Sequence, residues 1–331
     1  MLFFSGSFMS LKIPMPLIEL LSDGEFHSGE AIGQEFSISR TAVWKQLKKL
    51  EELGLGVASV KGKGYQLEKP IELLNASVIQ NEIDAKRLDI EVEVIPSVDS
   101  TNTELSRRPH KNKGLLLLAE QQTAGKGRRG RQWQSPFAKN IYLSFAWRFD
   151  KGLHQLDGLS LVVGLMVAET VSNMGFDDVS VKWPNDVYIS NKKIAGILLE
   201  ISGDPTDSGQ VIIGVGVNVN ADMADMSGID QAWTSLKQES GDMVSRTRWV
   251  TTFMPKMVAA IQQFEKMGFA AFAERWEKLD WLSGQQVVLT LGQEQIFGEA
   301  KGVTETGALK VEDGGVVKVF TGGEVSIRRS S

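Results

Sequence analysis

The 331-residue sequence contains no cysteine and only three histidines, which excludes several classes of catalytic site. Without cysteine the chain can form no disulfide, no thiolate nucleophile and no cysteine-ligated zinc site. His27, His110 and His154 are scattered, so neither a histidine metal site nor a Ser-His-Asp triad is expected. Aspartate and glutamate remain available to hold Mg²⁺ beside phosphates.

Long hydrophobic runs are also absent. The longest, residues 159–168, is about half the length of a membrane span and lies between Asp157 and Glu169, which predicts a buried core helix. Residues 1–8 have no leading positive charge and no long apolar core, so no signal peptide is predicted. Met9 is an alternative start. We therefore expect a soluble, cytoplasmic protein that does not bind membranes.

Length and charge give further bounds. A chain of 331 residues predicts two or three domains with ample core. Its formal net charge of −5 argues against coating of nucleic acid by the whole surface, although a local basic patch remains open.

The first part of the chain, residues 1–68, is predicted to be a winged helix-turn-helix domain. A short helix over residues 16–21 is followed by a helix capped by Ser28 and by a third helix that Ser39 begins. In the third helix Val43, Leu47 and Leu50 fall on one face. The hairpin that forms the wing is predicted over residues 57–60 and 65–67, which a Lys-Gly-Lys-Gly turn joins.

Charge supports DNA binding by this domain. Residues 37–66 hold six Lys/Arg and two Asp/Glu, a local charge of +4 in an acidic chain. Phosphate contacts are expected from cations at the hairpin tip. A solvated charged face, or a domain that docks only proteins, is the alternative. The candidate DNA-binding residues are Ser28, Ser39, Arg40, Thr41, Trp44, Lys45, Lys48, Lys61 and Lys63.

Pro70 and Asn75 mark a linker to a central α/β domain, residues 77–282, and a C-terminal domain, residues 283–331. Thr101-x-x-Glu104 is a capping-box pattern that predicts a helix start. Further helices are predicted over residues 251–267 and 269–279. The expected central strands are 91–95, 115–119, 140–147, 186–189, 194–201 and 211–217. The expected C-terminal strands, which predict a small barrel, are 287–291, 295–301, 307–311, 316–320 and 325–328.

The segment 120–134, EQQTAGKGRRGRQWQ, carries the strongest chemical signal. Glycines let the backbone approach an anion, arginines clamp carboxylate or phosphate, and Trp133 offers a face for a flat heterocycle. Its GxGxxG spacing also fits a dinucleotide loop, but Ser135-Pro136 and a strand follow where a helix is required. The Walker pattern is absent. A solvated basic turn is the simplest alternative to a ligand loop.

Three later motifs add to this site. Lys182-Trp183-Pro184-Asn185-Asp186 forces a turn with amide and carboxylate groups, although a structural Asx turn explains it equally well. Lys193 and Gly196 suit an anionic ligand, or else an exposed hairpin lysine. Gly214, Gly216 and Asn218 permit a ligand against bare backbone, or close packing of strands.

Together these motifs resemble the bifunctional biotin protein ligases that also repress the biotin operon. The resemblance covers residues 14–329 and includes Asp99-Ser100-Thr101-Asn102. It implies an α+β multidomain protein: a winged helix-turn-helix, a class II synthetase-like ligase domain with a mixed sheet, and a C-terminal SH3-like barrel. It also implies biotin, ATP and Mg²⁺ as ligands. The implied partners are a biotin carboxyl carrier protein of acetyl-CoA carboxylase, operator DNA and a second copy of the chain.

The resemblance also implies residue roles. The biotin head would be bound by Ser100, Thr101, Asn102 and Gln122. The carboxylate of biotin and the phosphate would be held by Lys126, Gly127, Arg128 and Lys193. Catalysis is assigned to Lys193, Arg128 and Lys126. Trp133, Asn185 and Asn218 would lie near adenine, and Arg129 and Arg131 would order the loop. The whole ligand-binding set is Ser100, Thr101, Asn102, Gln122, Gly125, Lys126, Gly127, Arg128, Arg131, Trp133, Lys182, Asn185, Asp186, Lys193, Gly196, Gly214, Gly216 and Asn218; no protein metal ligand is assigned.

One position departs from the family pattern, because Lys126 stands where arginine is usual and loses the planar fork. The implied reaction joins biotin to AMP and passes it to a lysine of the acceptor protein, without an enzyme nucleophile. Two alternatives remain: a lipoate-protein ligase, which shares the catalytic fold, and a DNA-binding regulator that only senses biotin. The cationic loop with Lys182 and Lys193 favours an active ligase.

Overall fold

The structure, a computed structural model, describes residues 13–108, 114–149, 156–202, 210–292, 294–322 and 325–329. His110 and His154 lie outside these ranges. The chain divides into two units. The first comprises residues up to 73 together with 136–138, and the second comprises residues 74–135 and those from 139 onward.

The N-terminal unit has three helices and a hairpin: α1 (Met15–Leu21), α2 (Gly29–Glu35), α3 (Arg40–Glu52), β1 (Val57–Val60) and β2 (Gly64–Leu67). The predicted caps are confirmed, since Ser28 Oγ accepts from Ala31 N and Ser39 Oγ from Ala42 N. Val43, Leu47 and Leu50 are buried as their spacing predicts. β1 and β2 pair antiparallel. Phe137 and Ala138 join this core.

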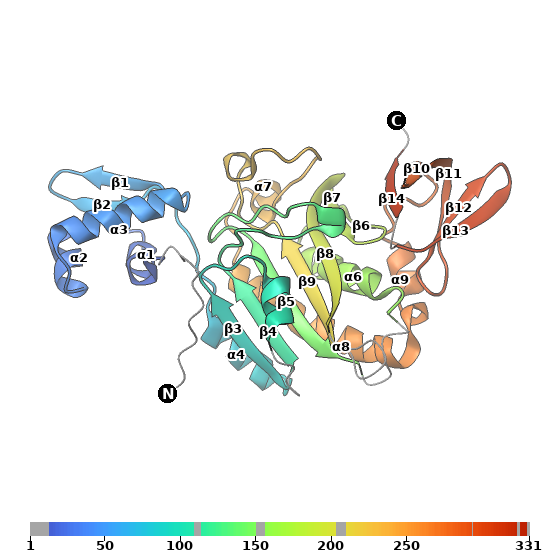
Figure 1. Ribbon diagram of the computed structural model, residues 1–331, viewed down its shortest axis with the longest axis horizontal. Helices are drawn as coiled ribbons and strands as arrows, with labels where there is room; N and C mark the ends of the chain where they lie inside the picture. Colours follow the sequence, from blue (N-terminus) through green and yellow to red (C-terminus); the bar gives the residue numbers. More distant parts are fainter. Residues whose placement is uncertain are drawn as a thin grey trace. The chain divides into compact units, whose positions relative to one another are not determined.

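The second unit is built on a seven-stranded mixed sheet (Figure 1), in the order β3-β4-β5-β9-β8-β7-β6. Only β3 and β4 run parallel; the other neighbours are antiparallel. The strands are β3 (Ile90–Ile95), β4 (Gly114–Ala119), β5 (Ile141–Arg148), β6 (Val179–Lys182), β7 (Asp186–Ile189), β8 (Lys192–Ser202) and β9 (Gln210–Val217). Ser190 and Asn191 join β7 to β8 with positive φ, the conformation that a two-residue hairpin turn needs.

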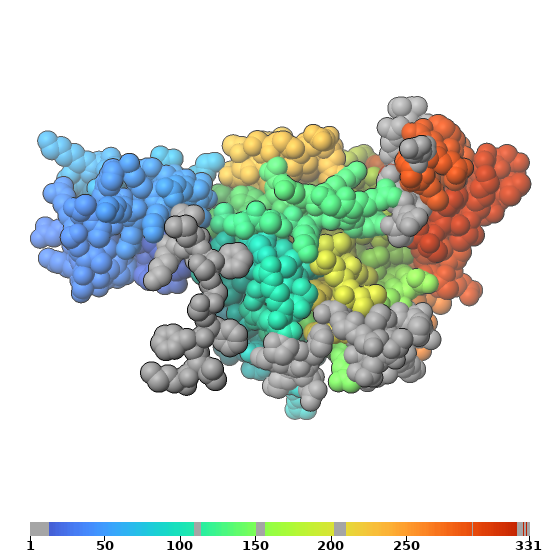
Figure 2. Space-filling view, in the orientation of Figure 1, coloured from blue at the N-terminus to red at the C-terminus, as the bar shows by residue number. Residues whose placement is uncertain are grey.

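The leucine run of β4 is buried on both faces. Leu116 and Leu118 lie in the main core with α4 (Ala76–Ala85), α6 (Leu159–Asn173) and α8 (Arg246–Met267). Leu115 and Leu117 instead pack with Leu105 of α5 (Thr101–Arg107) on the other face, as the alternation of side chains along a strand requires. In the space-filling view the teal residues around α5 lie beside the yellow residues of the central sheet (Figure 2).

Several predicted boundaries in this unit are wrong. Thr101 does not cap α5: Ser100 is the N-cap, without a side-chain cap bond, and the Thr101 hydroxyl bonds Gln122 instead. Asn75 is not merely linker, because its side chain caps α4. Ser245 starts α8 earlier than predicted. The expected helix 269–279 is two short pieces, η4 (Phe269–Ala271) and α9 (Ala273–Glu277).

Five antiparallel strands follow near the end of the chain, in the order β13-β12-β11-β10-β14. They are β10 (Gln286–Leu291), β11 (Glu294–Val303), β12 (Leu309–Asp313), β13 (Val316–Phe320) and β14 (Val325–Arg329). All five correspond to predicted runs. Leu289, Ala300 and Leu309 belong to the same core as α6 and α8, so this sheet is packed on the central part of the unit. Short segments η1 (Arg128–Gly130), η3 (Met223–Met226) and α7 (Leu236–Ser240) complete the unit.

Candidate active site and nucleic-acid interface

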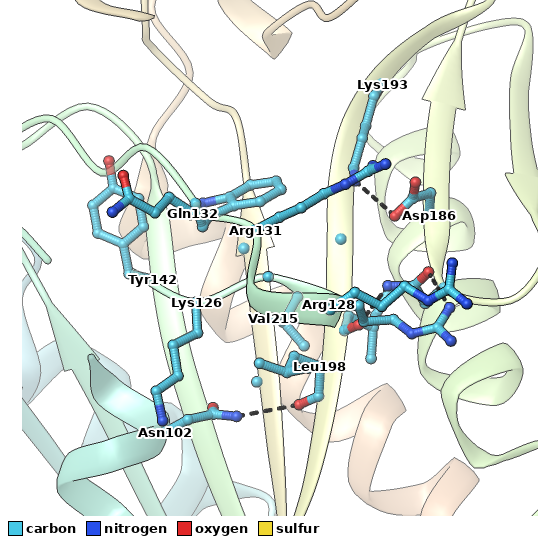
Figure 3. Close-up of a pocket in the computed structure, with 18 of the residues that line it drawn as sticks. Asn102, Lys126, Arg128, Arg131, Gln132, Tyr142, Asp186, Lys193, Leu198 and Val215 are labelled. Atoms are coloured by element: carbon cyan, nitrogen blue, oxygen red, sulfur yellow. Dashed lines mark hydrogen bonds and ion pairs between the residues drawn. The ribbon is translucent and has the colours of Figure 1, made fainter. Parts of the chain in front are cut away.

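One pocket in the second unit collects residues from α5, the cationic loop after β4, the β6–β7 turn and strands β8 and β9. Figure 3 shows Asn102 and Lys126 at one end of it and Lys193 with Asp186 at the other. The lining residues that carry polar groups or bare backbone are Ser100, Thr101, Asn102, Gln122, Lys126, Gly127, Arg128, Arg129, Arg131, Gln132, Trp133, Tyr142, Lys182, Trp183, Asn185, Asp186, Lys193, Gly196, Gly214, Gly216 and Gln231.

The first end of the pocket is a chain of neutral hydrogen-bonding groups. Thr101 donates to Gln122 Oε1 from its backbone N (2.9 Å) and its hydroxyl (3.1 Å). Gln122 Nε2 donates to Ser135 Oγ at 3.0 Å, and the buried hydroxyl of Ser144 donates to Thr101 Oγ1 at 2.7 Å. Such fixed amides and hydroxyls suit an uncharged polar head group, because they can both donate and accept.

Glycines in β8 and β9 let the strand backbone lie close to Asn102 and Trp133. A Cβ on Gly214 would lie 2.3 Å from Asn102 Oδ1, and one on Gly216 would lie 2.5 Å from the Trp133 indole. Gly196, which pairs with Gly216 across β8 and β9, also faces that indole. Side chains at these positions would therefore displace Asn102 or Trp133. The Trp133 Nε1 is buried without a hydrogen-bond partner, so it is available to a ligand.

The second end of the pocket is cationic. Lys193 Nζ lies 2.8 Å from Asp186 Oδ1 and 5.5 Å from the centroid of the Trp133 ring. Both members of this ion pair are largely buried, with side chains 13% and 17% exposed. The pair therefore fixes the direction of the Lys193 side chain at the place where β7 and β8 meet.

Arg128 reaches across the pocket mouth from the cationic loop. It donates to Asn185 Oδ1 at 3.2 Å and to the carbonyl of Gly322, and Asn185 Nδ2 donates to Ile197 O at 2.8 Å. Burial lowers the pKa of Arg128, while Asp186 opposes that shift. Even so lowered, a guanidinium stays charged at neutral pH and can clamp an anion.

Lys126 is directed toward the neutral end and away from the cluster around Lys193. Its Nζ lies 3.6 Å from Glu200 Oε1, and Asn102 Nδ2 donates to Glu200 Oε2 at 2.8 Å. Both charged side chains are partly exposed, so this ion pair is worth less than about 1 kcal/mol.

All but two of the predicted ligand-binding residues line this pocket. Gly125 lies behind it, where a Cβ would meet the Trp133 carbonyl oxygen at 2.4 Å. Asn218 is buried at the end of β9, with its Oδ1 3.4 Å from Asn140 Nδ2. Gly125 and Asn218 therefore do not line the pocket themselves; they support the residues that do.

The sequence analysis missed a buried ion pair beside the loop. Arg246 Nη1 lies 2.8 Å from Glu120 Oε2, and their side chains are 0% and 2% exposed. Glu120 Oε1 also accepts from Leu74 N at 2.6 Å. The sequence places Glu120 only at the start of a loop, and no local pattern points to a partner at the start of α8.

Trp281, Arg329 and Ile327 were also missed. Ile327 lines the pocket from β14, while Trp281 and Arg329 contact each other behind Lys182. A tryptophan and a basic strand end carry no motif of their own, so only the contact between distant segments identifies them.

The N-terminal unit presents the predicted DNA-contact residues to solvent. The exposed residues on α3 are Arg40, Thr41, Trp44, Lys45 and Lys48, and those at the hairpin are Lys61 and Lys63. Lys48 Nζ lies 4.0 Å from the Trp44 ring centroid. The hydroxyls of Ser28 and Ser39 accept the helix-capping bonds described above, which leaves each able only to donate to a phosphate.

Carboxylates are few around the ligand pocket. Across the described ranges no group of three or more His, Asp or Glu side chains is placed to hold a metal ion. Within the same ranges no helix is both long and apolar enough to cross a membrane.

Comparison with known proteins places each part of the chain. Residues 94–218 match the biotin/lipoate A/B protein ligase family, residues 16–66 match an HTH domain, and residues 282–328 match the biotin protein ligase C-terminal domain. The bifunctional ligase/repressor BirA of Escherichia coli (strain K12) is 43% identical over 317 residues, which are 96% of this chain and 97% of that protein. The protein of the same name in Bacillus subtilis (strain 168) is 30% identical and covers 92% of this chain and 96% of its own length.

A solved structure agrees with these relatives. The biotin protein ligase from Aquifex aeolicus in complex with biotin and ATP has a TM-score of 0.65 and 31% identity, covering 72% of this chain and 99% of that one. Because the bifunctional relatives match nearly end to end, helix-turn-helix segment included, this chain belongs to the family of bifunctional biotin ligases and repressors.

Proposed function

We propose that this chain is an ATP-dependent biotin protein ligase that also represses biotin synthesis genes in response to biotin. The observation that carries the ligase activity is the pocket described above, in which neutral hydrogen-bonding groups, strand glycines and a cationic end are brought together. In the similar structure from Aquifex aeolicus the bound molecules are biotin and ATP. We assign the head of biotin to the end around Thr101 and Gln122, and its carboxylate to the end around Lys193.

The reaction follows from the poor electrophilicity of a carboxylate. A carboxylate oxygen of biotin attacks the α-phosphorus of ATP, the bond to the β-phosphate oxygen breaks, and biotinyl-5′-AMP and pyrophosphate form. Lys193 and Arg128 offset the repulsion between the two anions and the charge that develops on the α-phosphate. The lysine amine of the acceptor then attacks the carbonyl carbon and releases AMP.

Mg²⁺ would supply further charge neutralisation at the phosphates. The pocket fits an ion held mainly through those phosphates, because Asp186, the one carboxylate among the described lining residues, is already paired with Lys193. The protein's own residues would hold and orient the nucleotide. The cationic loop would exclude water from the mixed anhydride by ordering over it.

The finer architecture and partners belong to the same proposal. We propose three domains, residues 1–68, 77–282 and 283–331, with a winged first domain and an SH3-like barrel as the third. The acceptor would be the biotin carboxyl carrier protein of acetyl-CoA carboxylase, and the protein would act in the cytoplasm. Two copies would bind one operator, because one helix-turn-helix reads only a half-site.

The decisive test offers a biotin-free acceptor domain, ATP and either biotin or lipoate to the purified chain. Biotin-dependent acceptor labelling with pyrophosphate release is expected, and labelling only by lipoate would favour the lipoate ligase alternative. Binding of biotin without any adenylate or labelled acceptor would leave only a sensor.

A separate test addresses repression. Gel shifts on an operator with two half-sites should show tighter binding with biotin plus ATP, because the adenylate is expected to strengthen dimerisation. Arg40→Ala should weaken the shift without affecting acceptor labelling. Equal affinity with and without the ligands would remove the repressor assignment and leave the ligase intact.

A further inference from the structure

Lys182 is a pocket cation with an unusual set of partners. Its side chain lines the pocket, and its Nζ lies 5.1 Å from the Trp281 ring centroid and 5.4 Å from that of Tyr188. The Tyr188 hydroxyl is 3.4 Å away. Within the described part of the chain no carboxylate lies within ion-pair distance of Lys182, whereas Lys193 has Asp186 and Lys126 has Glu200.

This difference matters for anion binding. A carboxylate partner neutralises an ammonium group and competes with an incoming phosphate. An aromatic face stabilises the same group without adding negative charge. Burial lowers the pKa of Lys182; Asp186 opposes the shift, while the neighbouring cations Lys193, Arg131 and Arg329 add to it. Of the three pocket lysines, Lys182 is thus the one whose surroundings most favour the arrival of an anion.

Trp281 is itself held in place by three contacts. Its ring stacks on Tyr188 with centroids 5.0 Å apart, and its Nε1 donates to Asn191 Oδ1 at 2.8 Å. The Arg329 guanidinium lies 3.5 Å from the Trp281 centroid and donates to the Trp281 carbonyl. Strand β14 therefore contributes to the pocket twice: directly through Ile327, and indirectly through Arg329 and Trp281 to Lys182.

The geometry of the proposed reaction indicates which anion arrives. In-line displacement at the α-phosphorus sends the pyrophosphate away from the biotin carboxylate. With Lys193 and Arg128 assigned to the carboxylate and the α-phosphate, the β- and γ-phosphates need a cation beyond them. We propose that Trp281 and Arg329 are positioning residues that hold Lys182 toward the β- and γ-phosphates of ATP, an inference that rests on the proposed ligase function.

The test measures binding, independently of turnover. Calorimetry compares the non-reactive α,β-methylene analogue of ATP with AMP, which lacks the distal phosphates, and with biotin. Trp281→Leu should weaken binding of the analogue about tenfold, the size expected for loss of a partly desolvated cation–π contact, and should change AMP and biotin affinity less than twofold. Trp281→Phe, which keeps a ring, should restore most of the affinity.

Two further variants separate positioning from general damage. Trp147→Leu removes a comparable half-buried tryptophan outside the pocket and should leave all three affinities unchanged. In a Lys182→Met background, Trp281→Leu should cost nothing more, because its effect is transmitted by Lys182. If Trp281→Leu does not fold, Arg329→Gln replaces it, with a smaller loss expected for the analogue alone.

Three results would overturn the inference: full affinity of Trp281→Leu for the analogue, equal losses for the analogue and AMP, or additive losses in the double variant. Each of these presupposes that the wild-type chain binds biotin and the analogue. If the wild-type chain binds neither ligand and forms no adenylate, the proposed function fails instead, so the two failures are distinguishable.

Discussion

Lys193 offers the sharpest test of the pocket chemistry. Its Nζ sits 2.8 Å from Asp186 Oδ1 in a largely buried pair, so Lys193→Ala removes a fixed positive charge where two anions must meet. Loss of one such stabilising group costs about 3 kcal/mol of transition-state stabilisation, which is roughly a hundredfold in rate. The ion pair also contributes to folding, and leaving Asp186 unpartnered should cost about 2 kcal/mol of unfolding free energy.

The assay is biotin-dependent exchange of labelled pyrophosphate into ATP, run well below the variant's unfolding temperature. Lys192→Ala is the matched control, because that lysine is adjacent, half-exposed and paired with Glu239 at 3.6 Å, outside the pocket lining. It should keep the wild-type exchange rate. A wild-type exchange rate in folded Lys193→Ala would refute the role of this charge in adenylation.

Three other perturbations follow from the same contacts. Trp133→Ala should weaken ATP binding more than biotin binding in calorimetry, because the indole is assigned to the adenine end. Lys126→Arg should keep or improve biotin affinity, since a guanidinium restores the planar fork of the family pattern and presents two parallel donors to a ligand. Burial raises the pKa of Asp280 from 3.8 to about 6, so the folded chain holds this proton between pH 4 and 6 and its free energy of unfolding falls as pH rises through that range. Chemical denaturation should find Asp280→Asn stabilised relative to wild type by on the order of 2 kcal/mol more at pH 7.5 than at pH 4.

Each of these has a clear opposite outcome. Equal losses of biotin and ATP affinity in Trp133→Ala would contradict the adenine assignment. A large fall in biotin affinity in Lys126→Arg would mean that the pocket has adapted to the shorter lysine head. A pH-independent difference between Asp280→Asn and wild type would show that Asp280 is ionised with an ordinary pKa in the folded chain.

Local signals predicted the parts of the fold that depend on neighbouring residues. Ser28 and Ser39 cap helices because each precedes an amphipathic run, and both bonds are present. Thr101 shows the limit of such signals. Helix α5 begins one residue earlier than its capping-box spacing predicts, with Ser100 as the N-cap, and the Thr101 hydroxyl bonds Gln122 instead. Ser245 and Asn75 capped helices that the sequence analysis placed late or omitted.

The sequence predicted which residues belong to the site, but it did not predict which of them contact one another. Gly214 and Gly216 share a strand face by period alone, so their common role follows from the sequence. That Trp133 lies on Gly216 and Gly196 depends on the register between β8 and β9, which no local pattern specifies. The Glu120–Arg246 pair has the same origin, since its members are brought together only by the packing of α8 against the sheet.

The three lysines of the pocket differ in what a ligand must displace. Lys193 is paired with Asp186 and Lys126 with Glu200, so an anion that binds either one competes with a carboxylate already in place. The Asp186 pair is the stronger competitor, because both of its side chains are largely buried, whereas the Glu200 pair is open to solvent and to salt screening. Lys182 has aromatic partners and, among the residues that the structure describes, no carboxylate within ion-pair distance. The physical argument therefore assigns the most highly charged part of the nucleotide to Lys182, and leaves Lys126 to close the loop over the neutral end.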